Sequence, residues 1–333
     1  MPTSTLTVVV PAYNEQETIA PFTRELAAVL DGIGMDWTVL FVDDGSSDRT
    51  LDLLRDLNGS DSRFQAIALS RNFGKEIAMA AGLRYARGDA VVIMDADLQH
   101  PPRVISEFLA RWREGYKVVF GDRRARDADG FLRRGYSAVF HAIFRRIART
   151  PLQPGAVDFI LMDRVAVDAV NRLNERTRFS KGLFSWVGFR STVVPFDYGA
   201  RAGGRSHWSF LKLARFALDG FVSFSNMPLK VWSYLGAVIS LGALAYALYF
   251  ILKTLIFHPD VPGFPSLIVS IMFFSGVQLV SLGIIGEYLA RIYDEVKARP
   301  LFIVAEEVGL GEVQVSARQT VGEATSAKSA TDA

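Results

Sequence analysis

Residues 90–102 read AVVIMDADLQHPP, an apolar run that ends in two carboxylates, Asp95 and Asp97, followed by a proline pair. A short apolar run bounded by turn residues predicts a buried central strand of a mainly parallel sheet. Both aspartates then lie at the carboxyl end of that strand, where open α/β sheets bind their ligands. Two hard oxygen ligands at this spacing suit Mg²⁺ or Mn²⁺, and the metal would hold a diphosphate. For this stretch alone, a solvated turn whose aspartates cap the next helix is an equal alternative.

The composition is that of an α/β domain with an additional apolar region. Half of the 333 residues are hydrophobic and the net charge is only +2, while the mean hydropathy of +0.20 is high for a wholly soluble protein. The absence of cysteine excludes disulfides, thiolate metal sites and a cysteine nucleophile. The first apolar run, Leu6–Val10, is too short for a signal peptide, and we expect it to form a strand.

Strand and helix signals alternate over residues 5–125. The alternation predicts right-handed βαβ units and a parallel sheet covered on both faces. Strands are expected at Thr5–Val10, Thr38–Val42, Gln65–Leu69, Ala90–Met94, Lys117–Phe120 and Ser191–Phe196. Helices are expected at Glu15–Leu30, Ser47–Leu57, Lys75–Ala86 and Pro102–Trp112, and Asp158–Asn171 is expected to supply a strand and a helix.

Two later segments, Trp232–Phe257 and Pro265–Leu289, each supply the roughly 20 apolar residues that cross a bilayer. The connection between them carries no Lys or Arg, whereas basic residues flank the pair, so the positive-inside rule predicts cytoplasmic flanks. Two buried core helices are the less favoured alternative. Phe131–Arg149 and Trp208–Lys230 mix basic and apolar residues and suit interfacial helices, although the first fits an ordinary helix packed on the sheet equally well.

These signals predict a linear organisation of the chain. A catalytic domain over residues 1–207 is followed by an interfacial amphipathic helix at 208–230 and two transmembrane helices within 231–290. A cytoplasmic segment at 291–308 and a polar, disordered tail at 309–333 complete the chain.

Polar motifs follow three further predicted strands at the same sheet edge: PAYNE at 11–15, VDDGSSD at 42–48 and SRNFGK at 70–75. Tyr13 offers a flat face for a base, an aspartate of the second motif can accept a hydrogen bond from a ribose, and the third places cations beside a helix N-terminus. Each motif alone also fits an ordinary turn or helix cap. The chain lacks the GxGxxG and GxxxxGK[ST] motifs, so a nucleoside diphosphate held through a metal is the favoured ligand.

In this order and spacing, PAYNE, VDDGSSD, RNFGK and MDADLQHPP resemble the inverting family 2 glycosyltransferases of the GT-A fold. With RFSKGLFSWVGF and the apolar C-terminal pair, the chain more narrowly resembles polyprenyl-phosphate glycosyltransferases such as bactoprenol glucosyltransferases and dolichol-phosphate mannose synthases. The resemblance covers about residues 5–300. A processive polysaccharide synthase is disfavoured, because the chain lacks a Gln-x-x-Arg-Trp motif and further spans.

The resemblance implies inverting transfer of a sugar, first of all glucose from UDP-glucose, to undecaprenyl phosphate. It places the enzyme in the cell (inner) membrane as a multi-pass protein with the catalytic domain and both termini cytoplasmic. Its partners would be a nucleotide-diphosphate sugar, a polyprenyl phosphate lipid and the membrane, without nucleic acid, and a homo-oligomer is a further option. GDP-mannose, UDP-GlcNAc or a UDP-aminoarabinose derivative are alternative donors. A non-catalytic, membrane-tethered sugar-nucleotide binding protein is a less favoured alternative.

The resemblance also assigns roles to individual residues. Contacts to the nucleotide sugar fall on Pro11, Tyr13, Glu15, Asp44, Lys75, Asp95 and Arg201. The resemblance implies that Asp95, Asp97 and Gln99 bind the metal, Mg²⁺ or Mn²⁺. It implies that Arg123, Arg133 and Ser137 bind the phosphate of the acceptor. A surface or lipid-headgroup charge is an equal interpretation for Arg133.

The catalytic assignments implied by the resemblance are Asp97 and Asp158, the second matching a position proposed as the base. A lipid phosphate is already ionised near neutral pH, so Asp158 would instead orient the acceptor or cap a loop. Arg201 lies in a glycine-containing segment, 198–208, that resembles a loop closing over the donor. Relatives usually carry Lys where this chain has His207, and the charge of a histidine depends on pH. We expect neighbouring Arg205 to take over the phosphate-binding role of that position.

Overall fold

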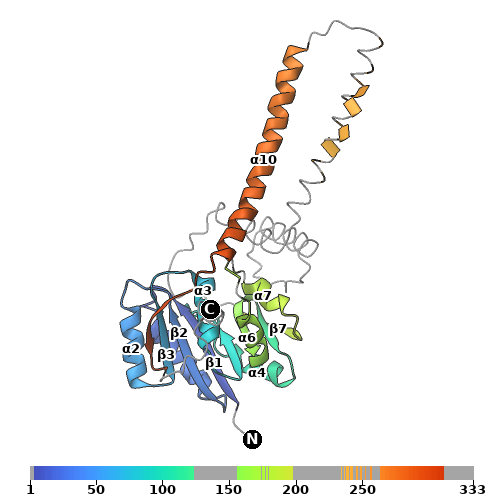
Figure 1. Cartoon of the computed structure of the whole chain (residues 1–333). Helices are drawn as coiled ribbons and strands as arrows, with labels where there is room; N and C mark the ends of the chain where they lie inside the picture. Colours follow the sequence, from blue (N-terminus) through green and yellow to red (C-terminus); the bar gives the residue numbers. More distant parts are fainter. Residues whose placement is uncertain are drawn as a thin grey trace, which may run out of the picture.

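The computed structural model describes residues 4–123, 156–173, 175, 176, 178, 180–197 and 263–310, together with single positions between Tyr234 and Ile256. Its centre is an eight-stranded sheet in the order β7-β5-β6-β4-β1-β2-β3-β8, from which one long helix projects (Figure 1). The strands are β1 (Thr5–Ala12), β2 (Asp36–Asp43), β3 (Phe64–Leu69), β4 (Ala90–Ile93), β5 (Val118–Arg123), β6 (Ala156–Asp163), β7 (Ser191–Phe196) and β8 (Val304–Val308). The helices are α1 (Ile19–Leu30), α2 (Thr50–Ser60), α3 (Lys75–Tyr85), α4 (Val104–Arg113), α6 (Arg164–Asn171), α7 (Ser180–Trp186) and α10 (Phe264–Val296).

The sheet is mainly parallel, as the sequence predicts. β1 lies between β2 and β4 and pairs in parallel with both, and β2 continues in parallel to β3. β6 is antiparallel to both β4 and β5, so the sheet is mixed beyond its centre. The carboxyl ends of β1, β2, β3 and β4 therefore meet at one edge.

The core lies on both faces of this sheet because the central strands are apolar on both sides. In β1, Val8 and Val10 belong to the core cluster that contains Phe22 of α1 and Phe108 of α4. Val9, between them, belongs to the opposite cluster, which contains Met79 of α3. All three valines are fully buried, so charged side chains are accommodated only where the central strands end.

Helix α1 begins at Ile19, later than the predicted Glu15. The residues before it form a turn, in which Asn14 has a left-handed φ of 55° and the N–H of Thr18 donates to the Glu15 carbonyl at 3.0 Å. This turn keeps residues 13–18 at the sheet edge instead of drawing them into the helix.

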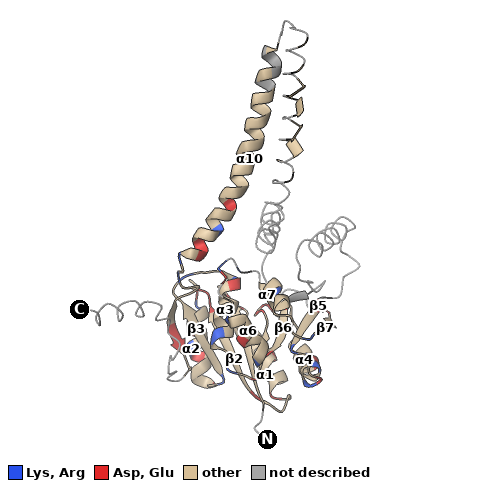
Figure 2. Cartoon of the chain, turned by 45° about the vertical axis from the view of Figure 1, so that its right-hand side comes forward, with Lys and Arg blue, Asp and Glu red and all other residues tan. Residues whose placement is uncertain are grey.

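Helix α10 contains the second apolar segment predicted from the sequence, Pro265–Leu289, and continues to Val296. Its part Ser270–Val296 is long and apolar enough to cross a membrane, and it is the one such helix among the described residues. Its charged residues, Glu287, Arg291, Asp294 and Glu295, gather at the end nearest the sheet (Figure 2). Within the first predicted span, Trp232–Phe257, the described single positions are helical. The predicted interfacial helices at 131–149 and 208–230, and the tail beyond Leu310, lie outside the described residues.

After α10 the chain returns to the sheet as β8, a strand that the sequence did not predict. β8 runs antiparallel to β3, and the N–H of Ser70, just past the end of β3, donates to the Ile303 carbonyl at 2.9 Å. The Arg55 guanidinium donates to both carboxylate oxygens of Glu306, at 2.9 and 2.6 Å. The chain from α10 therefore joins the sheet at the carboxyl edge of β3.

Replacing Gly82 of α3 by alanine tests the close packing of this helix on the sheet. A Cβ at Gly82 would collide with Val9 Cγ1 and lie 3.1 Å from Val42 Cγ2. Overpacking costs about 1–3 kcal/mol, against a helix-propensity gain of at most about 1 kcal/mol. We expect Gly82→Ala to lower the thermal unfolding midpoint of the full chain in detergent.

The matched control is Gly59→Ala in α2, where an added Cβ meets nothing within 4 Å. It should leave the midpoint unchanged or raise it. A Gly82→Ala protein as stable as the Gly59→Ala protein would contradict the packing described for α3.

Candidate active site

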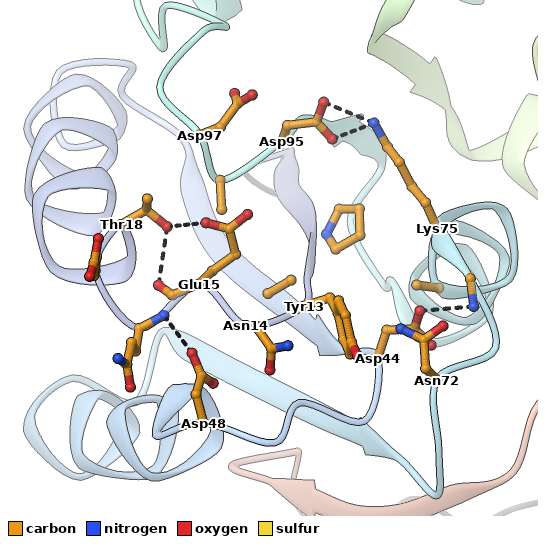
Figure 3. Close-up of a pocket in the computed structure, with 17 residues that line it drawn as sticks. Tyr13, Asn14, Glu15, Thr18, Asp44, Asp48, Asn72, Lys75, Asp95 and Asp97 are labelled. Carbon is orange, nitrogen blue, oxygen red and sulfur yellow. Dashed lines mark hydrogen bonds and ion pairs between the residues drawn. The ribbon is translucent and has the colours of Figure 1, made fainter. Parts of the chain in front are cut away.

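A cleft of about 780 Å³ opens at the carboxyl edge of the sheet, among the ends of β1, β2 and β4 and the start of α3 (Figure 3). The described residues that the sequence assigned to the nucleotide sugar all line it, and so does Asp97 of the expected metal site. They are Pro11, Tyr13, Glu15, Asp44, Lys75, Asp95 and Asp97. Residues distant in the sequence thus lie together at one cleft.

The loop after β1 is held to the loop after β2 by side-chain hydrogen bonds. Asn14 donates its N–H to Ser46 Oγ at 2.9 Å, and its Oδ1 accepts the N–H of Ser47 at 2.9 Å. Glu15 donates its N–H to Thr50 Oγ1 at 2.9 Å. Tyr13, which precedes this junction, lines the cleft with 48% of its surface exposed. An aromatic face on a fixed loop is suited to stacking on a planar ligand.

Asp44 connects the second loop to the third. Its buried carboxylate accepts the backbone N–H groups of Phe73 at 2.7 Å and Gly74 at 2.8 Å. Burial raises the pKa of Asp44, and these two N–H groups act in the opposite direction. Gly45 allows the two loops to touch, because a Cβ there would collide with the backbone of Arg71 and Asn72. Asp44 therefore places the start of α3, and with it Lys75.

Lys75 is the centre of a charged cluster at one wall of the cleft. Its Nζ lies 2.6 Å from Asp95 Oδ1 and 2.9 Å from Asp158 Oδ2. Asp158 lies outside the cleft lining, and its other oxygen, Oδ1, lies 3.3 Å from Lys181 Nζ. Burial disfavours the ionised form of Asp158, but Lys75 and Lys181 outweigh burial and lower its pKa to about 2. Burial likewise opposes the charge on Lys75, and Asp95 and Asp158 outweigh it and raise the pKa of the ammonium.

Asp95 and Asp97 form the oxygen-rich side of the cleft. The described residues contain no group of three His, Cys, Asp or Glu that would hold a metal by themselves. A Mg²⁺-type site commonly uses one or two carboxylates together with water and substrate phosphates, so the pair fits a cation that binds with a diphosphate. Gln99 does not line the cleft, and its backbone N–H donates to Asp97 Oδ1 at 3.0 Å. Its predicted assistance to a metal stays a prediction.

Sequence reasoning missed two residues of this site. His100 is buried, accepts the N–H of Asp95 on its Nδ1 at 3.3 Å and stacks on Phe159 with centroids 5.1 Å apart. It thus supports the chain at Asp95. Lys181 belongs to the RFSKG motif, whose lysine was the available signal.

Several predicted residues have no side-chain placement to compare. Arg123 ends β5, but its side chain lies outside the described part of the structure. The other predicted phosphate ligands and the predicted loop residues lie entirely outside the described part of the structure. They are Arg133, Ser137, Arg201, Arg205 and His207.

Comparison with known proteins gives consistent matches over most of the chain. The profile described as Glycosyl transferase family 2 matches residues 7–170. An uncharacterised glycosyltransferase of Synechocystis sp. is 48% identical over 92% of this chain and 96% of its own length. The bactoprenol glucosyl transferase of Shigella phage SfII is 39% identical over 90% of this chain and 97% of its own. Among solved structures, a mannosyltransferase from Pyrobaculum calidifontis is 20% identical, with 87% of each chain covered and a TM-score of 0.45.

Replacing Asp44 by asparagine tests its role as the link between the loops. The amide presents one NH₂ group where the carboxylate accepted an N–H, so a buried donor loses its acceptor. Hydrogen bonds to charged groups contribute about 1.5–3 kcal/mol, and we expect a loss of stability on that scale. The measurement is the thermal unfolding midpoint of the full chain.

Asp52→Asn is the control, because Asp52 is an exposed carboxylate whose ion pair with Arg55 lies on the surface of α2. It should change stability by no more than about 0.5 kcal/mol. Equal midpoints for the two variants would show that the Asp44 carboxylate does not hold the loop.

Proposed function

The chain belongs to glycosyl transferase family 2 and is a glycosyltransferase, and we propose that it moves a sugar from a nucleoside diphosphate to a polyprenyl phosphate. The observation that carries this proposal is the cleft that Tyr13, Asp44, Lys75, Asp95 and Asp97 line together (Figure 3). The bactoprenol glucosyl transferases supply the acceptor class and favour UDP-glucose and undecaprenyl phosphate as the substrates.

Different parts of the cleft would bind the base, the ribose and the diphosphate of the donor. The base would stack on Tyr13, with the ribose near Asp44 and the diphosphate near Lys75, Asp95 and Asp97. Mg²⁺ or Mn²⁺ held by Asp95 and Asp97 would supply positive charge that offsets the diphosphate and stabilises the departing nucleoside diphosphate. Lys75, already charged beside Asp95, can give up one aspartate contact for a phosphate oxygen.

The acceptor oxygen attacks the anomeric carbon from the side opposite the leaving diphosphate, which inverts configuration. The attacking group is a phosphate oxygen, so no strong base is required. Asp158 is a poor proton acceptor, since its two lysines lower its pKa to about 2. Its role in this proposal is to hold Lys75 and Lys181.

The enzyme would act at the cytoplasmic face of the cell membrane as a multi-pass protein with both termini cytoplasmic. Supporting this, the exposed apolar helix α10 connects to the sheet at the edge that carries the cleft. A lipid whose headgroup emerges at the membrane surface can therefore reach the cleft without leaving the bilayer. The basic residues that flank the two apolar segments favour this orientation.

A donor panel tests the proposed reaction. Purified full-length protein, undecaprenyl phosphate and Mg²⁺ or Mn²⁺ are incubated with radiolabelled UDP-glucose, UDP-GlcNAc, GDP-mannose and a UDP-aminoarabinose derivative. We expect a lipid-extractable labelled product, with UDP-glucose giving the fastest transfer. Absence of lipid-linked product with every donor would refute the proposed function.

Replacing Asp97 by asparagine removes one negative charge from the metal-binding pair. We expect transfer to fall by at least about 100-fold, the scale of losing one preorganised electrostatic contact to developing charge. Asp61→Asn serves as the control and should retain full activity, since the partly exposed Asp61 pairs with Arg63 away from the cleft. If the Asp97→Asn protein transferred sugar at the wild-type rate, Asp97 would not be a metal ligand.

The pH dependence of transfer tests the role of Asp158. A carboxyl whose pKa is lowered on folding is ionised throughout the range above pH 4, and its stabilising contribution is lost only as the pH falls toward 2. We therefore expect Asp158→Asn to slow transfer by a factor that is constant from pH 5 to 9. An acidic limb present in the wild-type profile and absent from the Asp158→Asn profile would identify Asp158 as a base instead.

A further inference from the structure

Asp158 separates two lysines that lie on different sides of it. Lys75, on its Oδ2 side, lines the donor cleft, whereas Lys181, on its Oδ1 side, does not. One carboxylate thus has an ammonium on the donor side and a second ammonium just outside the cleft. A single lysine would balance the charge of Asp158, and Lys75 Nζ already lies 2.9 Å from Asp158 Oδ2.

The segment that carries Lys181 is held from two directions. The N–H of Ser180 donates to Glu76 Oε2 at 2.9 Å, and Glu76 follows Lys75 in the first turn of α3. Earlier in the segment, the N–H of Arg176 donates to Glu295 Oε1 at 2.8 Å, near the end of α10. Lys181 is therefore positioned between the helix that carries the donor-side lysine and the helix that leads into the membrane.

Lys181 also keeps access to solvent. Its side chain is 35% exposed, and a lysine ammonium has three donors, of which one is directed at Asp158 among the described contacts. A compact ammonium beside a reaction centre is a suitable point charge for a phosphate. An inverting transfer requires the nucleophile to approach from the side opposite the leaving diphosphate, and Lys181 lies across Asp158 from Lys75, the residue that the proposal assigns to that diphosphate.

We propose that Lys181 binds the phosphate of the lipid acceptor and that Asp158 positions this lysine. The inference rests on the proposed function and adds to it an acceptor-binding residue on α7. The lipid phosphate would arrive from the α10 side and place one oxygen on Lys181. Lys75 would remain with the diphosphate, so that one carboxylate keeps the two phosphate-binding cations apart.

The test compares Lys181→Met with Lys181→Arg and with Lys297→Met, which removes an exposed lysine just past α10. We expect Lys181→Met to raise the KM for undecaprenyl phosphate at least tenfold and to leave the KM for the sugar nucleotide within twofold. Lys181→Arg should recover most of the acceptor affinity, and Lys297→Met should resemble the wild type. Equal changes in both KM values, or a lower kcat alone, would overturn the proposal.

A binding experiment separates this inference from the proposed reaction. Farnesyl phosphate, UDP and inorganic phosphate are each titrated calorimetrically into the full-length variants in detergent. Lys181→Met should weaken farnesyl phosphate binding at least tenfold with UDP affinity unchanged, even if no donor is turned over. Unchanged farnesyl phosphate affinity refutes the role of Lys181, and equal binding of inorganic and farnesyl phosphate refutes a lipid-specific site. If Lys181→Met lowers the unfolding midpoint, Lys181→Gln replaces it in both experiments.

Discussion

The parallel pairing of β1 with β2 and β4 is the constraint on which the rest of the structure depends. These strands are buried on both faces, so they offer no place for charged side chains except at the ends. Parallel pairing brings those ends to one edge, and the loops there bond to one another through Asn14, Ser46 and Asp44. The cleft is thus a consequence of the strand order, and its residues need not be near one another in the sequence.

Electrostatic balance then determines how the charged residues share that edge. Asp95, Lys75, Asp158 and Lys181 alternate in sign along one path, and the contacts favour the charged forms of Lys75 and Asp158. Four charges could not approach so closely in a half-buried wall without this alternation. The same balance makes the cluster responsive to a phosphate, because an incoming anion can replace an aspartate at either lysine.

The sequence predicted the features that depend on local pattern and missed those that depend on distant contacts. Apolar runs bounded by polar turns located β1 to β5, and their following motifs identified the residues that line the cleft. The start of α1 was misplaced because the residues before Ile19 form a separate turn, and the N–H of Glu15 bonds to Thr50 Oγ1 in a distant segment. β8 was missed because VAEEV is a short, half-exposed edge strand whose partner is 235 or more positions away. Lys181 was missed although it lies in the RFSKG motif, because the motif alone does not show that this lysine pairs with Asp158.

The return of the chain as β8 restricts how the catalytic domain sits relative to α10. The Arg55–Glu306 ion pair is exposed and contributes little, so the backbone ladder between β3 and β8 provides the main attachment. The burial of Leu310 just beyond the strand adds an apolar contact. Only residues 297–303 separate α10 from β8, and Glu295 attaches the end of the same helix to the segment before α7. Both attachments hold the end of α10 to the domain, and the Ser70–Ile303 hydrogen bond places the following chain at the sheet edge that carries the cleft.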